Sequence, residues 1–318
     1  MSEPEPRGSG AGPGSAEQPL DPEVAKRVAA LTYRARRAVE GLLSGIHRSP
    51  HRGASVVFVE HREYRPGDDP RLLDWRAFAR TDRHVIKRFE QETQLRATLL
   101  LDRSGSMAWR GFDPKPGDPS KHEHAATLLA ALAYVLVGQG DATGAAGFDV
   151  ALHDDLLPPG SRPAHVEQLL RRLARPPTEG ARTDLATALR RLAERAGRRG
   201  VVAVASDLLD GRSEALVPLA QLVTRGHEVV VFHVLTPDEL ELRVEGAARF
   251  RGLEGEGPLE ADADAVREAY RREMDAFLEE CRRRCTAAGA RYVLARTDEP
   301  VERTLASVVR RGRGGWGR

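Results

Sequence analysis

Long apolar runs and cysteines are scarce in this chain of 318 residues, and each shortage excludes a class of protein. The longest apolar stretch, residues 125–138, is well short of the roughly 20 residues that a bilayer requires, so we expect no membrane span. The first 20 residues are rich in Gly, Pro, Ser and Glu and contain no apolar segment typical of a signal peptide. We therefore predict a cytoplasmic protein.

The two cysteines, Cys281 and Cys285, lie in a segment that we predict to be helical. Their spacing is unlike the disulfide framework of a secreted domain and favours a reducing compartment. We expect one thiol to be buried and the other to be partly exposed.

An excess of either charge sign is also missing, since 49 basic residues nearly balance 47 acidic ones. This balance gives no strong attraction to a polyanion, so we expect no nucleic-acid partner. The chain lacks the phosphate-binding loop of NTPases and the G-x-S-x-G motif of serine hydrolases. With 41% hydrophobic and 30% charged residues, it should nevertheless fold as a globular protein.

The order of apolar and polar segments predicts several parts along the chain. A helix should start at Asp21-Pro22 and end near Gly45, and strands are expected at 55–59 and 84–89. The predicted parts are a disordered tail (1–20), an N-terminal helix with a β-containing attachment (21–95), an α/β domain (96–310) with an insertion at about 237–260, and a basic tail (311–318). Within the insertion, 242–244 and 249–251 are candidates for a small hairpin.

In the α/β domain, apolar strands alternate with long helices, the pattern of a mainly parallel sheet covered on both faces. Right-handed crossovers then give a doubly wound, Rossmann-type sheet. We also expect 151–157 to form an antiparallel edge strand. The predicted strands are 97–102, 143–148, 201–206, 228–235 and 291–295, and the predicted helices are 122–137, 165–173, 185–196, 213–224 and 263–288.

Oxygen-bearing side chains lie in three of the loops at the strand ends, where ligands bind in such a sheet. Asp102, Ser104 and Ser106 follow the first predicted strand, Thr183 precedes a helix, and Asp207 follows a later strand. Hard oxygen donors favour Mg²⁺, or Mn²⁺, over zinc, which prefers His and Cys ligands. The alternative is that the two serines cap the following helix and that Asp102 is a satisfied strand-end carboxylate.

These residues resemble the metal-ion-dependent adhesion site of von Willebrand factor A domains, in which Asp-x-Ser-x-Ser, a Thr and an Asp come from three loops. The resemblance implies that Ser104 and Ser106 bind Mg²⁺ directly and that Thr183 binds it directly or through water. It also implies that Asp102 and Asp207 hold metal-bound waters. The last coordination position is then left for a carboxylate of a partner.

The chain also resembles a bacterial family of uncharacterised proteins encoded beside MoxR-type AAA+ ATPases, over roughly residues 20–310. The resemblance implies two partners, a MoxR-type AAA+ ATPase and a client protein that offers Asp or Glu. The family usually carries a pair of membrane-spanning helices, which this N-terminal sequence lacks, so we expect no membrane tether. The residues that carry the resemblance are 62–76, 79–80, 89–90, Glu92, 206–208, Glu254, Arg267, Tyr270 and 297–298.

The most specific part of this resemblance alternates in charge around a tight turn at Pro66-Gly67. We expect a salt-bridge network that either docks this segment on the sheet as a structural clasp or contacts a partner directly, with Trp75 as an anchor. Its candidate residues are Tyr64, Arg65, Asp68, Asp69, Arg71, Asp74 and Trp75.

Two functions follow from these patterns. The first is a non-enzymatic, chaperone-like adaptor that binds a partner carboxylate through Mg²⁺ and works with the ATPase in protein remodelling or complex maturation. The alternative is a metal-dependent hydrolase of phosphate or acyl esters, with Asp102 or Asp207 as base. We expect His122 and His124 to lie on an exposed helix start, and His153, Asp154 and Asp155 to form a solvated polar cluster.

Overall fold

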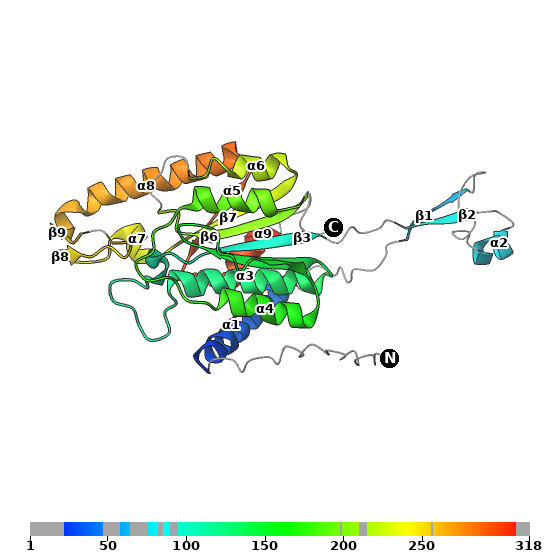
Figure 1. The fold of residues 1–318 in the computed structure, drawn as a ribbon, viewed down its shortest axis with the longest axis horizontal. Helices are drawn as coiled ribbons and strands as arrows, with labels where there is room; N and C mark the ends of the chain where they lie inside the picture. The colour runs from blue at the N-terminus through cyan, green and yellow to red at the C-terminus, as the bar shows by residue number, and fades with distance from the viewer. Residues whose placement is uncertain are drawn as a thin grey trace, which may run out of the picture.

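The computed structural model describes residues 22–46, 58–63, 75–81, 85–89, 95–197, 199–209, 215–255 and 257–309. A six-stranded sheet forms its centre, in the order β10-β7-β6-β3-β4-β5 (Figure 1). Neighbouring strands are parallel except for β4 and β5, which are antiparallel. This order is that of a doubly wound α/β fold, so the predicted fold class is confirmed. The strands are β3 (Arg96–Asp102), β4 (Ala142–Phe148), β5 (Leu157–Gly160), β6 (Gly200–Ser206), β7 (His227–Leu235) and β10 (Arg291–Arg296).

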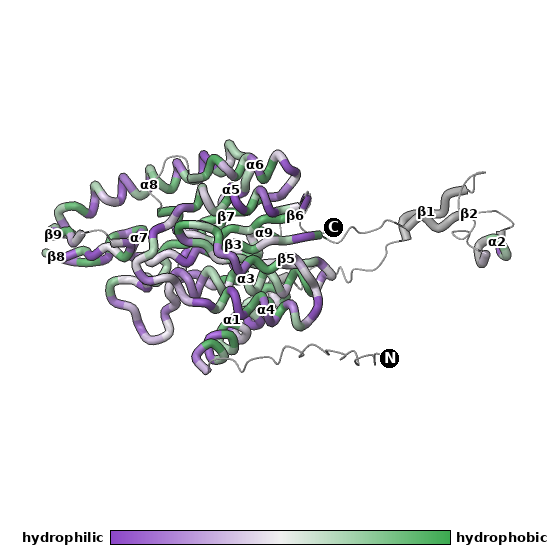
Figure 2. Tube along the Cα trace, viewed as in Figure 1, coloured by the Kyte–Doolittle hydropathy of each residue, from purple (hydrophilic) through white to green (hydrophobic). Residues whose placement is uncertain are grey.

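Helices cover both faces of this sheet (Figure 1). Because both faces are covered, every residue of β4 and β6 is buried, and both strands consist largely of Ala, Val and Gly. Figure 2 shows hydrophobic residues concentrated in the strands of the sheet. One face is covered by α1 (Pro22–Ile46), α3 (Lys121–Gly138), α4 (Pro163–Leu173) and α9 (Val301–Val309), and the other by α5 (Leu185–Arg195), α6 (Leu219–Thr224) and α8 (Ala263–Ala287).

The first helix belongs to the same core as the sheet. Leu31, Ala35, Ala38 and Leu42 of α1 recur on one helical face and are all buried. That face packs against α3 and α9. The predicted division grouped this helix with the β-containing attachment, whereas its packing places it in the core of the α/β unit.

Several predicted elements end elsewhere than expected. Of the described residues in the helix predicted at 213–224, only those of α6 are helical, because residues 215–218 form a turn that ends at Pro218. The antiparallel edge strand is β5 rather than 151–157, of which Leu152 makes only an isolated bridge to Phe148. Helix α9 and the short helix α7 (Pro237–Glu241) were not predicted.

The predicted hairpin of the insertion pairs different segments. The structure pairs β8 (Ala247–Phe250) with β9 (Leu259–Asp262) as an antiparallel hairpin. The prediction of 242–244 as a strand was wrong, because Leu242 adopts a left-handed conformation, with φ of 51°, that ends α7.

A second, separate hairpin pairs β1 (Phe58–Glu63) with β2 (Val85–Phe89), and α2 (Trp75–Thr81) lies between them in the sequence. Trp75 is 62% exposed and packs edge-on against Phe78, so it is not a buried anchor among the described residues. The other candidate clasp residues lie outside the described part of the chain. Of the helices that are described, none is long and apolar enough to cross a membrane.

Candidate functional site

The strand order reverses between β3 and β6, and the predicted site residues gather at the carboxyl ends of these two strands. Asp102 is the last residue of β3, and Asp207 directly follows β6. Loops that leave two such strands in opposite directions open a crevice, which is the usual ligand position in a doubly wound sheet. Both aspartates are fully buried there.

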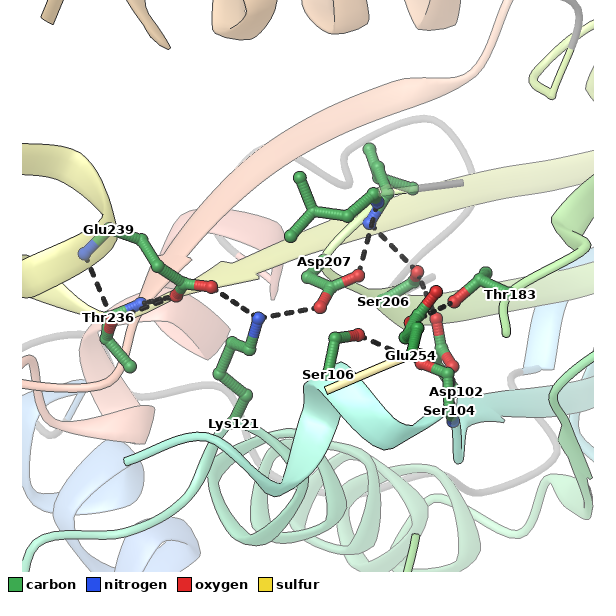
Figure 3. A network of polar contacts seen from close by, with 12 residues as sticks. Asp102, Ser104, Ser106, Lys121, Thr183, Ser206, Asp207, Thr236, Glu239 and Glu254 are labelled. Atoms are coloured by element: carbon green, nitrogen blue, oxygen red, sulfur yellow. Dashed lines mark hydrogen bonds and ion pairs between the residues drawn. The ribbon is translucent and has the colours of Figure 1, made fainter. Parts of the chain in front are cut away.

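Hydroxyl and amide groups surround the Asp102 carboxylate (Figure 3). The Ser104 amide donates to Asp102 Oδ1 at 2.9 Å, and the Ser206 hydroxyl donates to Asp102 Oδ2 at 2.5 Å. The Ser104 and Ser106 hydroxyls lie 3.1 Å apart, and Ser106 also donates to the Asp207 carboxylate. The Asp-x-Ser-x-Ser segment therefore directs its three polar side chains toward one region, as the spacing predicted.

The predicted second loop, between α4 and α5, reaches the same region. Its backbone is attached to the first loop, because the Gly105 amide donates to the Ala181 carbonyl at 2.8 Å. Thr183 is buried, and its hydroxyl donates to Glu254 Oε1 at 3.2 Å. Hydrogen bonds link the predicted metal ligands Asp102, Ser104, Ser106 and Asp207, and Thr183 comes from the loop that is bonded to Gly105 (Figure 3).

The alternative role of the serines as helix caps fails for Ser104. Ser104 precedes the short 3₁₀ helix η2 (Gly105–Ala108), but its side chain makes no capping hydrogen bond. Its hydroxyl contacts Ser106 instead. A buried hydroxyl that does not cap the next helix is free to serve as an oxygen ligand.

Sequence reasoning missed Lys121, which enters the site from the first turn of α3. Its Nζ donates to Asp207 Oδ2 at 2.6 Å and to Glu239 Oε1 at 2.5 Å, and its side chain is only 1% exposed. A capping box fixes this helix start, since Ser120 and Glu123 each bond the other's backbone amide. The sequence Ser-Lys-His-Glu, with Glu three positions after Ser, is the pattern that could have predicted this capped helix start.

The prediction that His122 and His124 lie on an exposed helix start was wrong. They are 5% and 3% exposed, because α3 is covered on nearly all sides by the sheet and by α1, α4 and α9. Burial lowers the pKa of each to about 4, so both imidazoles are neutral near pH 7.

The donor set fits a hard cation in its chemistry. Apart from the Lys121 ammonium, which is bonded to Asp207 and Glu239, the polar side chains that meet around the Asp-x-Ser-x-Ser segment offer oxygen, which suits Mg²⁺ or Mn²⁺. In the described residues, no group of three or more His, Cys, Asp or Glu side chains is arranged to hold a metal ion. A cation at this site would therefore depend on the Ser104, Ser106 and Thr183 hydroxyls.

Comparison with known proteins identifies the family of this chain. Residues 60–279, more than two thirds of the sequence, match the family described as "Protein of unknown function DUF58". The chain belongs to the DUF58 family. This DUF58 protein is 29% identical over 293 residues to "Uncharacterized protein Rv1480" of Mycobacterium tuberculosis, which covers 91% of this chain and 89% of the relative.

Solved structures of distant proteins overlap with about two thirds of this DUF58 chain. The conserved hypothetical protein BatB from Bacteroides thetaiotaomicron is 17% identical, with a TM-score of 0.45, and covers 67% of this chain and 96% of its own. The von Willebrand factor A domain of SpRpn10 is 10% identical, with a TM-score of 0.36, and covers 67% and 94%. An aerotolerance-related membrane protein from Bacteroides fragilis is 20% identical, with a TM-score of 0.42, and covers 67% and 96%.

The two aspartates of the DUF58 site differ in their protonation. Burial raises the pKa of Asp102 to about 7, and the neighbouring Asp207 carboxylate adds to the rise. Burial alone would also raise the pKa of Asp207, but the charge and hydrogen bond of Lys121 hold it below its ordinary value. In the same way, Asp207 and Glu239 outweigh the burial of Lys121 and raise the pKa of its ammonium.

The remaining candidate residues of this DUF58 protein have structural roles. Cys281 and Cys285 are both buried, which corrects the expectation of one partly exposed thiol, and burial raises the pKa of Cys285 to about 12. His153 lies 2.9 Å from Asp149 and 3.0 Å from the Arg103 guanidinium. These contacts tie the loops after β3 and β4 together.

Proposed function

We propose that this DUF58 protein is a non-enzymatic adaptor that binds a carboxylate of another protein through a divalent cation at its strand-end site. The observation that supports this most is the convergence of three loops: Asp102, Ser104, Ser106 and Asp207 form one hydrogen-bonded group where the strand order reverses, and the loop that carries Thr183 is bonded to Gly105. These residues are far apart in the sequence and share oxygen chemistry. A binding role needs nothing more than that set and an accessible coordination position.

In this proposal Ser104, Ser106 and Thr183 hold Mg²⁺ with their hydroxyl oxygens. The carboxylates of Asp102 and Asp207 already accept hydrogen bonds from backbone amides, hydroxyls and Lys121, so they suit water-mediated contacts better than direct ones. When bound, Mg²⁺ supplies positive charge that attracts an external carboxylate. Lys121 holds Asp207 in place from the other side.

The partners that we propose are those that the sequence resemblance implies. They are a MoxR-type AAA+ ATPase and a client protein that presents Asp or Glu, and the adaptor would recruit the client for remodelling or maturation. Because such an ATPase consumes ATP, the proposal places the complex in the cytoplasm.

Side chains around the site offer additional contacts to a partner. The loop between η2 and α3 packs against the insertion, since the Phe112 ring lies 6.0 Å from the Phe250 ring and the Phe112 amide donates to Asp238 Oδ2. Phe112, Leu253 and Leu259 nevertheless remain 37%, 39% and 64% exposed. This apolar rim suits a protein partner better than a small anion.

A pull-down with Mg²⁺ tests the adaptor function. The full-length protein is incubated with the MoxR-type ATPase from the same genome and with native lysate, in Mg²⁺ or in EDTA. Wild type should capture the ATPase or a client only with Mg²⁺, and Ser104→Ala/Ser106→Ala and Asp102→Ala should not. Ser44→Ala, an exposed serine on α1, is the matched control and should behave as wild type. Capture that persists in EDTA and in Asp102→Ala would contradict the adaptor mechanism.

A metal-dependent hydrolase is the second candidate, because two buried carboxylates, Asp102 and Asp207, lie at the proposed cation site and either could act as the base. The hydrolase interpretation predicts turnover of p-nitrophenyl phosphate or p-nitrophenyl acetate with Mg²⁺ or Mn²⁺, lost in Asp102→Ala. An absence of turnover, combined with Mg²⁺-dependent capture, would favour the adaptor.

A further inference from the structure

The segment after β8, residues 251–255 and here named the covering loop, directs one carboxylate into the strand-end site. Glu254 is 8% exposed, whereas Leu253 beside it is 39% exposed. Among the described residues from 251 to 260, Glu254 is the only buried one. Burying a carboxylate costs free energy unless a specific interaction compensates for it. The Thr183 hydroxyl supplies part of this compensation.

The covering loop contacts the segments that carry the predicted metal ligands in two ways, through the Glu254 side chain and through the Leu253 backbone. The Thr183 hydroxyl donates to Glu254 Oε1 at 3.2 Å (Figure 3). A Cβ added to Gly105 would lie only 2.3 Å from the Leu253 carbonyl oxygen. The loop therefore rests on the glycine between the two serines, where no larger residue fits.

We propose that Glu254 is an internal ligand of this site, with its carboxylate in the position that a partner's Asp or Glu would otherwise take. The proposal rests on the function proposed above, because it requires a divalent cation held by Ser104, Ser106 and Thr183. A partner must then displace Glu254, and the covering loop must move with it.

An internal ligand also determines which partners can bind. A tethered carboxylate competes at an effective concentration on the order of millimolar or more. A small free carboxylate competes poorly against it, whereas a protein that also contacts the rim at Leu253 and Leu259 gains the additional free energy it needs. The covering loop would in this way reject small anions and admit proteins.

A purely structural role for Glu254 makes a different prediction. If Glu254 only fastens the loop by accepting a hydrogen bond from Thr183, glutamine in its place would keep both the shape and the acceptor oxygen. A metal ligand, in contrast, depends on the negative charge that glutamine lacks. Glu254→Gln therefore separates the two roles.

The experiment compares full-length wild type, Glu254→Gln and Glu260→Gln. The Glu260 side chain lies on the same hairpin but is 79% exposed, so Glu260→Gln is the matched control. Mn²⁺ affinity is measured by electron paramagnetic resonance, and amide hydrogen exchange of the covering loop is measured with and without Mn²⁺. We expect Glu254→Gln to bind Mn²⁺ about 10- to 100-fold more weakly and to lose the Mn²⁺-induced protection of the loop. Glu260→Gln should match wild type in both measurements.

The outcomes separate this inference from the proposed function. Unchanged Mn²⁺ affinity and unchanged loop protection in Glu254→Gln would refute the internal ligand while the metal site remained supported. If wild type bound no Mn²⁺, or bound it equally well after Asp102→Ala, the proposed function would fail and the internal ligand with it.

Discussion

The strand-end site has two halves, and the buried carboxylates of each half are stabilised by a different kind of neighbour. The lysine half consists of Lys121, Asp207 and Glu239, in which one buried ammonium joins two carboxylates at 2.6 and 2.5 Å. The hydroxyl half consists of Asp102, Ser104 and Thr183, whose hydrogen bonds come from neutral hydroxyl and amide donors. Within the described residues, the Lys121 ammonium thus counters the negative charge of the lysine half. In the same part of the chain, only the dipoles of hydroxyl and amide groups stabilise the Asp102 carboxylate of the hydroxyl half.

The difference between the halves appears in their protonation. Asp207 beside Lys121 has a pKa below its ordinary value, whereas the pKa of Asp102 is raised to about 7. A buried carboxylate without a cationic neighbour favours either a proton or an added cation. We therefore place Mg²⁺ in the hydroxyl half, where the buried Asp102 carboxylate has no lysine partner among the described side chains.

Removing the ammonium of the lysine half should have the largest effect on stability. Lys121→Met leaves Asp207 buried without its counter-charge, so the free energy of unfolding should fall by about 3 to 5 kcal/mol. Lys26→Met is the matched control, because Lys26 pairs with Glu23 on the surface, where both side chains are more than half exposed. It should cost less than about 1 kcal/mol. Urea denaturation measures both, and equal losses would contradict the account of the lysine half.

Neutralising each aspartate in turn should change stability in opposite directions. In EDTA at pH 8, Asp207→Asn removes the partner of buried Lys121, and the free energy of unfolding should fall by about 2 to 4 kcal/mol. Asp102→Asn removes a buried charge that faces Asp207, and stability should rise by about 1 kcal/mol or more. Urea denaturation again measures the change. A loss of similar size in both variants would show that the two halves do not differ.

The pH dependence of stability should identify Asp102. Its folded pKa of about 7 lies above the ordinary value of 3.8, so the folded chain binds an extra proton between these two values. The stability that Asp102 contributes is therefore fully present below about pH 4 and is lost as pH rises toward 7. In EDTA, the unfolding free energy of wild type minus that of Asp102→Asn should decrease across this window. Saturating Mg²⁺ should remove the decrease, and parallel curves in EDTA would contradict it.

Glu239, the more exposed carboxylate of the lysine half, should contribute least to the free energy of unfolding. The Glu239 side chain is 17% exposed, and Lys121 retains Asp207 without it. Glu239→Gln should therefore lower the unfolding free energy by about 1 kcal/mol. Glu241→Gln on the same helix should stay within about 0.5 kcal/mol of wild type. A loss in Glu239→Gln as large as that in Lys121→Met would show that the ammonium depends on both carboxylates equally.

The sequence predicted the hydroxyl half far better than the lysine half. Asp102, Ser104 and Ser106 are local in sequence and follow an apolar strand, so alternation alone places them together. Thr183 and Asp207 followed from the resemblance to adhesion sites and from the rule that parallel strands end at one edge. The structure links Asp102, Ser104, Ser106 and Asp207 by hydrogen bonds and places Thr183 on a loop bonded to Gly105.

Lys121 was missed, and Glu254 was named only as a residue that carries the family resemblance, because their roles depend on tertiary packing. Lys121 meets Asp207 across 86 positions of sequence, and a lysine at a helix start is usually solvated. Glu254 lies in an insertion whose strand pairing was predicted incorrectly, so no pattern in the sequence indicated that its side chain points inward. The fold was easier to predict because alternating strands and helices are a local pattern.

The position of a bound cation tests the central claim most directly. Crystals of the full-length protein grown with Mn²⁺ should be measured at the manganese absorption edge and compared with crystals of Asp102→Ala. The account predicts one anomalous peak at the strand ends, within coordination distance of the Ser104 and Ser106 hydroxyls and next to Glu254, and no such peak in Asp102→Ala. An empty strand-end site in wild type, or a peak unaffected by Asp102→Ala, would contradict it.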